Sequence, residues 1–273
     1  MKDIKTLIRK DIKELKRTKK LLILIVCEIV ISVMVLFATL LFPIFLSFIN
    51  NAAPDLLKNL GNIDSVMTGL LPDDLSDCMG LWSADMGMFY TIVLTVLASM
   101  AIPNEIKACK WIIPVNAGFK KKDIVISKAI VYGIFGSVSV FVSYMLYYLI
   151  GLLYLERNFS FIHALINALS LSVGFFAVAA DSVLLSYIAK SAVLPAFLHM
   201  ITILIVPDVF SLFDFGKYFP THVFTFAYNS LNRYNELVVP IAEIILIMAL
   251  LLLWVSYGQR TEKYIRNKEK KDE

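Results

Sequence analysis

The chain has 273 residues, of which 59% are hydrophobic, and a mean hydropathy of +0.75, which is too apolar for a soluble domain. Its formal net charge is +4, but the basic residues cluster beside apolar runs, where anionic membrane lipid attracts them. We therefore expect an all-α membrane protein in contact with membrane lipid, and we do not expect a nucleic-acid partner.

The N-terminal arm, residues 1–20, combines many Lys and Arg residues with regularly spaced apolar ones. Three- and four-residue spacings separate the apolar positions Ile4, Leu7, Ile8, Ile12 and Leu15. This periodicity predicts an amphipathic helix that lies in the cytoplasmic interface of the membrane. A solvated basic tail is the alternative.

Six apolar stretches follow, and each is read as a membrane-spanning helix within a transmembrane domain over residues 21–258. The predicted spans are residues 21–48, 86–103, 124–155, 162–187, 192–212 and 237–257. They leave an acidic outer segment at 50–85, a cytoplasmic loop at 104–123 and a basic tail at 259–273.

The distribution of positive charge predicts the orientation of these spans. If the spans alternate in direction, all but four of the 26 Lys and Arg residues fall on one side of the membrane. Cytoplasmic loops carry an excess of positive charge, so both termini are expected in the cytoplasm. The four exceptions are Lys58, Arg157, Lys217 and Arg233.

Catalytic motifs are absent from the sequence. No G-x-x-x-x-G-K-[ST] phosphate loop occurs, so the chain is not expected to hydrolyse ATP itself. No H-E-x-x-H motif occurs either, and His163, His199 and His222 are too far apart in the sequence to predict a shared metal site. We expect neither an enzyme nor a bound cofactor or metal.

Three acidic residues within the apolar stretches are candidates for a translocation path, because charge in hydrocarbon is expensive. Glu28 in the first span and Asp181 in the fourth lie several residues from the cytoplasmic ends and are expected to share a depth. Glu243 lies toward the outer side of the sixth span. The alternative is that these side chains only satisfy hydrogen bonds between helices.

The loop after the second span contains the most specific stretch of the sequence. A short helix is predicted at 105–113, stopped by Pro114, and a turn follows at 116–118. Three consecutive lysines at 120–122 then lead back to the membrane, where they would contact anionic headgroups.

This stretch resembles the loop between spans two and three of type-2 ABC exporter permeases, the membrane subunits of ATP-binding-cassette exporters. In that family a Glu ends the second span, a short coupling helix and a Pro-containing turn follow, and a Lys opens the third span. Glu105, Pro114 and Lys128 match that layout. The amphipathic N-terminal helix and the six spans extend the resemblance over most of the chain.

The resemblance implies a permease subunit of the bacterial cytoplasmic membrane, paired with a second permease subunit that is the same chain or a related one. A separate cytoplasmic ABC ATPase subunit would dock on the loop and drive a hydrophobic or amphipathic substrate, a peptide or a lipid, outward. The candidate coupling residues are Glu105, Lys107, Trp111, Ile112, Pro114 and Phe119.

Other classes of function remain open at this point. One alternative is that the loop is an ordinary cytoplasmic turn that binds no partner. An ion-coupled secondary transporter would use Glu28, Asp181 or Glu243 and need no ATPase. A membrane anchor or immunity protein would bind a partner through its acidic and aromatic outer segments without transporting anything.

Overall fold

The computed structural model describes residues 4–34, 48, 74–155, 158–206, 209, 216–228 and 234–272. This described part is all-helical and contains no strand, as the composition predicts. Four of its helical segments are long and apolar enough to cross a membrane. They are Leu75–Lys107, Lys121–Tyr154, Phe161–Ala189 and Tyr234–Gly258.

The N-terminal arm forms helix α1 (Ile4–Arg17), which packs on helix α9 (Lys121–Tyr154). Its buried face contains Leu7, Asp11 and Leu15, so one acid lies among the apolar positions that the periodicity identified. Lys19 adopts a positive φ of 56°, which turns the chain into a second helical stretch at residues 20–34. Residues 35–47 of the predicted first span lie outside the described part.

The second spanning segment begins earlier than predicted. It consists of α5 (Leu75–Asp85), the π-helix η1 (Met86–Tyr90), α6 (Thr91–Ser99) and α7 (Ala101–Lys107). Residues 75–85, which lie within the outer segment predicted at 50–85, therefore form the first part of this helix. The physical cause is a helix start at Asp74, whose side chain accepts a hydrogen bond from the Asp77 backbone amide at 2.9 Å.

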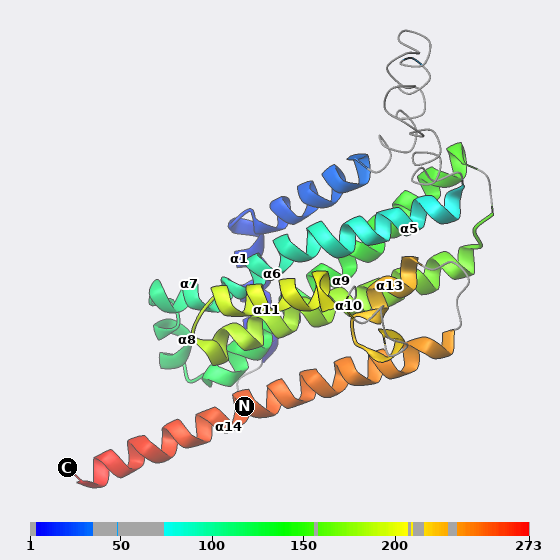
Figure 1. Cartoon of the computed structure of the whole chain (residues 1–273). Helices are drawn as coiled ribbons and strands as arrows, with labels where there is room; N and C mark the ends of the chain where they lie inside the picture. Colours follow the sequence, from blue (N-terminus) through cyan, green and yellow to red (C-terminus); the bar gives the residue numbers. More distant parts are fainter. Residues whose placement is uncertain are drawn as a thin grey trace.

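Helices α9 and α10 (Phe161–Ala189) form the antiparallel centre of the bundle (Figure 1). They match the predicted third and fourth spans to within a few residues. A Cβ added to Gly133 would lie 2.8 Å from the Phe176 ring, so glycine permits the close approach of the two helices. Helix α10 also contacts α6, α11, α13 and α14, which makes it the core element of the described part.

The remaining elements cover α10. Helix α11 (Val193–Leu204) lies within the predicted fifth span at 192–212, but its described length is too short to cross a bilayer. The short helix α13 (His222–Tyr228) follows, and then η3 (Tyr234–Leu237) leads into α14 (Val238–Asp272). Helix α14 continues without a break from the predicted sixth span through the basic tail and extends past the other helices (Figure 1). Six spans and a cytoplasmic location for both termini remain predictions.

Candidate functional site

The loop after the second span folds differently from the single helix predicted at 105–113. Helix α7 runs on to Lys107, a turn follows in which Cys109 has φ 52°, and a separate helix α8 spans Ile112–Asn116. The Lys110 amide donates to the Glu105 carbonyl at 3.0 Å, which closes the turn. Pro114 lies in the first turn of α8, where no amide hydrogen is needed, so it does not stop a helix.

A buried ionic network joins this loop to the N-terminal helix and to the start of α9. The Lys128 ammonium lies 2.6 Å from the Glu105 carboxylate and 3.1 Å from that of Asp11. Ser127 also donates to Asp11, at 2.5 Å. Because Asp11 is on α1, Glu105 on α7 and Lys128 on α9, one cation connects three elements that are far apart in the sequence.

Two further contacts extend the network toward the surface. Trp111 donates its indole N–H to Glu105 at 2.8 Å, and Lys110 donates to Glu14 at 2.7 Å. Both donors lie in the turn between α7 and α8 or next to it. The turn is thus attached to α1 and to the end of the second spanning segment at the same time.

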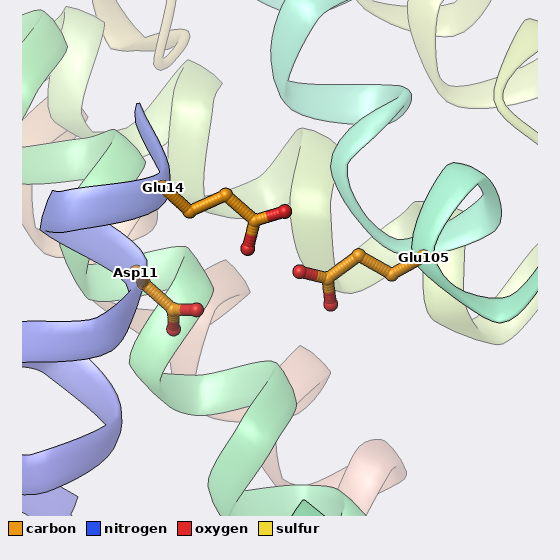
Figure 2. A group of neighbouring side chains, drawn as sticks. All are labelled: Asp11, Glu14 and Glu105. Atoms are coloured by element: carbon orange, nitrogen blue, oxygen red, sulfur yellow. The ribbon is translucent and has the colours of Figure 1, made fainter. Parts of the chain in front are cut away.

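Figure 2 shows that the carboxylates of Asp11, Glu14 and Glu105 gather in one place, and one oxygen of each lies within 4.8 Å of the others. Such a group resembles a divalent-cation site. Here, however, Lys128 contacts all three acids, at 2.6 to 3.9 Å, so an ammonium group already supplies the central positive charge. We assign the cluster a structural role.

The electrostatics of Glu14 follow from this crowding. Partial burial raises the pKa of Glu14, but the neighbouring Glu105 carboxyl, the hydrogen bond from Lys110 and the charge of Lys128 outweigh it. The pKa of Glu14 falls from 4.5 to about 2. On the other side of the cluster, burial and the charge of Lys128 lower the pKa of Lys20, which donates to the Tyr132 hydroxyl at 3.0 Å.

The candidate coupling residues separate into a buried and an exposed group. Glu105, Trp111 and Pro114 are buried, and the Trp111 ring stacks on Tyr187 of α10 with 6.0 Å between centroids. Phe119 is half-buried against the core. The exposed members are Lys107 and Ile112.

The side chains at the tip of the loop are apolar and exposed. Ile112 is 56% and Ile113 is 77% exposed, and Val115 lies next to them on α8. Sequence reasoning did not single out Ile113 or Val115. The adjacent apolar residues in a cytoplasmic turn were the available signal, since exposed neighbouring aliphatic side chains mark interaction surfaces.

The structure separates the two intramembrane acids that were expected to share a depth. Glu28 accepts a hydrogen bond from Ser143 of α9 at 2.9 Å. Gly136 of α9 faces the Phe175 carbonyl of α10. Beyond this contact Ser139 and Ser143, which lie beside Glu28, follow toward the end of α9, and Asp181 follows toward the end of antiparallel α10. At 1.5 Å per residue, Glu28 and Asp181 are therefore offset by about 14 to 20 Å along the helices.

The three candidate path residues thus have different surroundings. Ser139 and Tyr90 lie beside the Glu28 carboxylate, which gives it a polar environment within the bundle. Asp181 is buried, and its Oδ1 has no hydrogen-bond partner in the described part of the chain. Glu243 on α14 is half-buried, and its Oε2 is likewise without a partner among the described residues.

Asp11 and Glu14 were missed by the sequence analysis. The signal for Asp11 was present, because it lies four residues from both Leu7 and Leu15 and therefore on the apolar face of α1. An acid in that position needs a buried cation. Lys128, inside an apolar stretch, was the available partner.

The chain matches no protein-family model, and no curated protein has significant sequence similarity to it. Proposals about its function therefore rest on its own residues and geometry and on the resemblance in layout.

Proposed function

We propose that the chain is the transmembrane permease subunit of a bacterial ABC exporter, located in the cytoplasmic membrane. A separate ATPase subunit would supply the energy, because the sequence has no phosphate loop. A second permease subunit, the same chain or a related one, would complete the pathway. The transported molecule would be hydrophobic or amphipathic, either a peptide or a lipid.

The observation that supports this proposal most is the Lys128 network. A loop that transmits force must move together with the spanning helices and must not bend alone. The contacts of Lys128 with Glu105 and Asp11 attach the loop to α1 and α9, and the Trp111 bond to Glu105 attaches the turn itself. Displacement of α8 would therefore be passed on to two helices.

The surface proposed for the ATPase is the exposed apolar tip formed by Ile112, Ile113 and Val115. Apolar side chains at the centre of an interface contribute most of its binding energy, whereas charges at the rim contribute little. Trp111 and Pro114 lie beneath this surface and would hold it in place. Among the candidate coupling residues, Ile112 would thus contact the ATPase, whereas Trp111 and Pro114 would hold the contact surface in position.

The test is co-expression with candidate ATPase subunits, followed by purification in mild detergent and an ATPase assay. Ile112→Ser with Ile113→Ser should abolish co-purification and coupled ATPase activity while the permease itself remains folded. The matched control is Ile162→Ser, because Ile162 is also exposed, at 63%, but lies at the opposite end of α10. An intact complex with the double variant would overturn the docking surface.

Trp111→Phe tests the supporting role separately. It keeps the aromatic contact with Tyr187 but removes the indole N–H that Glu105 accepts. We expect the ATPase to bind with normal affinity, while transport per ATP hydrolysed falls. Loss of binding equal to that of the double isoleucine variant would mean that Trp111 touches the ATPase directly.

One observation favours a second candidate, an ion-coupled transporter. Asp181 is buried in α10 without a hydrogen-bond partner for its Oδ1 in the described region, and such acids within membranes mark proton or ion relays. Transport that stops when an uncoupler collapses the proton gradient, with ATP held constant, would favour this alternative. Transport that follows ATP and ignores the gradient would favour the exporter.

A further inference from the structure

A cavity of about 580 Å³ lies beside the coupling loop and is lined by none of Asp11, Glu105 and Lys128. Its volume is within the range of small-molecule binding sites. Its wall is largely aromatic and aliphatic, with Trp111, Tyr187 and Trp254 contributed by three different parts of the chain. An apolar wall of this kind suits a hydrocarbon chain.

Positive charge surrounds this apolar wall. Lys107 at the end of α7, Lys121 at the start of α9 and Lys190 at the end of α10 all line the cavity, and its lining contains no Asp or Glu. Lys107 and Lys190 have no carboxylate within salt-bridge distance in the described part of the chain, and both side chains are exposed. The cavity therefore combines an apolar interior with a cationic rim, in which Lys107 and Lys190 are the exposed charges that face no carboxylate of the described residues.

The cavity lies at one end of the candidate spanning segments. Each of the four spanning segments has an end in its lining or directly beside it, at Lys107, Lys121, Ala189 and Gly258. Trp254 precedes Gly258 by about one helical turn and is 63% exposed, so its ring lies farther into the apolar part of α14 than the end of the spanning segment at Gly258. The lysines and the apolar wall thus match the two parts of a phospholipid, since the phosphate would contact the lysines and the acyl chains would contact the apolar wall.

We infer that this cavity binds an anionic phospholipid, with its phosphate against Lys107 and Lys190 and its acyl chain against Trp254. Basic pockets between membrane helices on the cytoplasmic side suit acidic headgroups, and an apolar wall excludes a free phosphate as the preferred ligand. The inference does not require the proposed exporter function, because it rests on the lining of the cavity alone. The cavity and the proposed ATPase surface are adjacent and share Ile112.

Tryptophan fluorescence provides the test, because Trp254 is a natural reporter. Of the three tryptophans, Trp82 is fully buried and bonded to Ser32, and Trp111 is 9% exposed, so bromine on lipid chains should quench Trp254 above all. The full-length protein is placed in vesicles that contain equal fractions of brominated phosphatidylglycerol or brominated phosphatidylcholine. The wild type should be quenched more strongly by the anionic lipid, and Trp254→Phe should remove that difference.

The variant that tests the rim is Lys107→Gln with Lys190→Gln. Each lysine near an anionic surface contributes roughly a fivefold preference, so the pair should lose most of the selectivity for phosphatidylglycerol. The matched control is Lys13→Gln with Lys16→Gln, which removes the same charge from exposed positions on α1. Both variants change exposed side chains, so folding is preserved.

Three results would overturn the inference. Equal quenching of the wild type by the two lipids would show that no anionic lipid is preferred at Trp254. Selectivity that survives in the Lys107 and Lys190 variant would place the lipid elsewhere. An equal loss in the α1 control would mean that general attraction to the membrane surface, and not this cavity, produces the effect.

Discussion

The ammonium group of Lys128 lies 2.6 Å from the Glu105 carboxylate, and both side chains are almost completely buried. Lys128 also contacts Asp11 at 3.1 Å, whereas Lys10 lies farther from the same two carboxylates, at 3.8 and 3.9 Å, so Lys128 is the main cation of both buried acids. The attraction between the two charges of a buried pair offsets the cost of removing them from water, so the loss of one partner leaves a costly isolated charge. The pair therefore makes the attachment of α1 and the loop sensitive to single changes.

Replacing Lys128 by Met should destabilise the protein strongly. It would leave the buried carboxylates of Asp11 and Glu105 with only the more distant and more exposed Lys10 ammonium, and breaking a buried pair costs up to about 5 kcal/mol. Thermal unfolding in detergent measures the loss. Lys110→Met is the control, because Lys110 pairs with Glu14 at an exposed position and its loss should cost about 1 kcal/mol or less. Equal effects would contradict the special role of Lys128.

The stability of the α1 attachment should depend on pH through Glu14. The pKa of Glu14 is about 2 in the folded protein against 4.5 for the free side chain, so the unfolded chain takes up the proton first as the pH falls. Its contribution is complete above about pH 4.5 and is lost as the pH drops toward 2. As the pH is lowered from about 4.5 toward 2, the unfolding midpoint should fall less steeply for Glu14→Gln than for the wild type. Parallel curves would mean that Glu14 does not carry this dependence.

The local elements could be predicted from the sequence to a large extent. The apolar runs at 124–155 and 162–187 became α9 and α10 almost residue for residue, because a membrane span is encoded by contiguous hydrophobicity. The start of the second span was placed too late. Asp77 and Asp85 were assigned to the acidic outer segment, but an acid in the first helical turn favours a helix through its dipole, and Asp77 occupies that turn.

The candidate site was harder to predict from the sequence than the helices, because its residues are far apart in the chain. Glu105 and Lys128 were selected through a family layout, yet nothing in their spacing of 23 residues predicts a bond between them. Asp11 lies 117 residues from Lys128 and meets it only because α1 packs on α9. The supposed common depth of Glu28 and Asp181 failed for the same reason, since distances from helix ends do not fix the relative heights of two helices.

Gly174 should be intolerant of a side chain. A Cβ at this position would lie 2.8 Å from the Phe224 ring and 2.9 Å from Val223 Cγ2, and Val223 is completely buried. Overpacking of this kind costs about 1 to 3 kcal/mol, which exceeds the gain of about 0.5 to 1 kcal/mol from replacing glycine in a helix. Gly174→Ala should therefore lower the unfolding midpoint.

Gly87→Ala is the matched control for this change. A Cβ at Gly87 would meet nothing within 4 Å, so only the gain in helix preference remains. The unfolding midpoint of this variant should stay constant or rise. A Gly174→Ala protein as stable as Gly87→Ala would contradict the close packing of α10 against α13.

Asp181→Asn tests whether the buried acid of α10 serves transport or packing. The amide has the same shape as the carboxyl group but cannot ionise, and a neutral group is less costly to bury without partners, so the unfolding midpoint should be retained or raised.

We expect transport to change, because Asp181 is proposed as part of the translocation path. Uptake or efflux in vesicles, measured with and without an ion gradient, provides the readout. Ser182→Ala is the control at the same height, since Ser182 donates to the Val178 carbonyl of its own helix at 2.6 Å. Unchanged transport by Asp181→Asn would remove this residue from the path and leave it as a packing residue of α10.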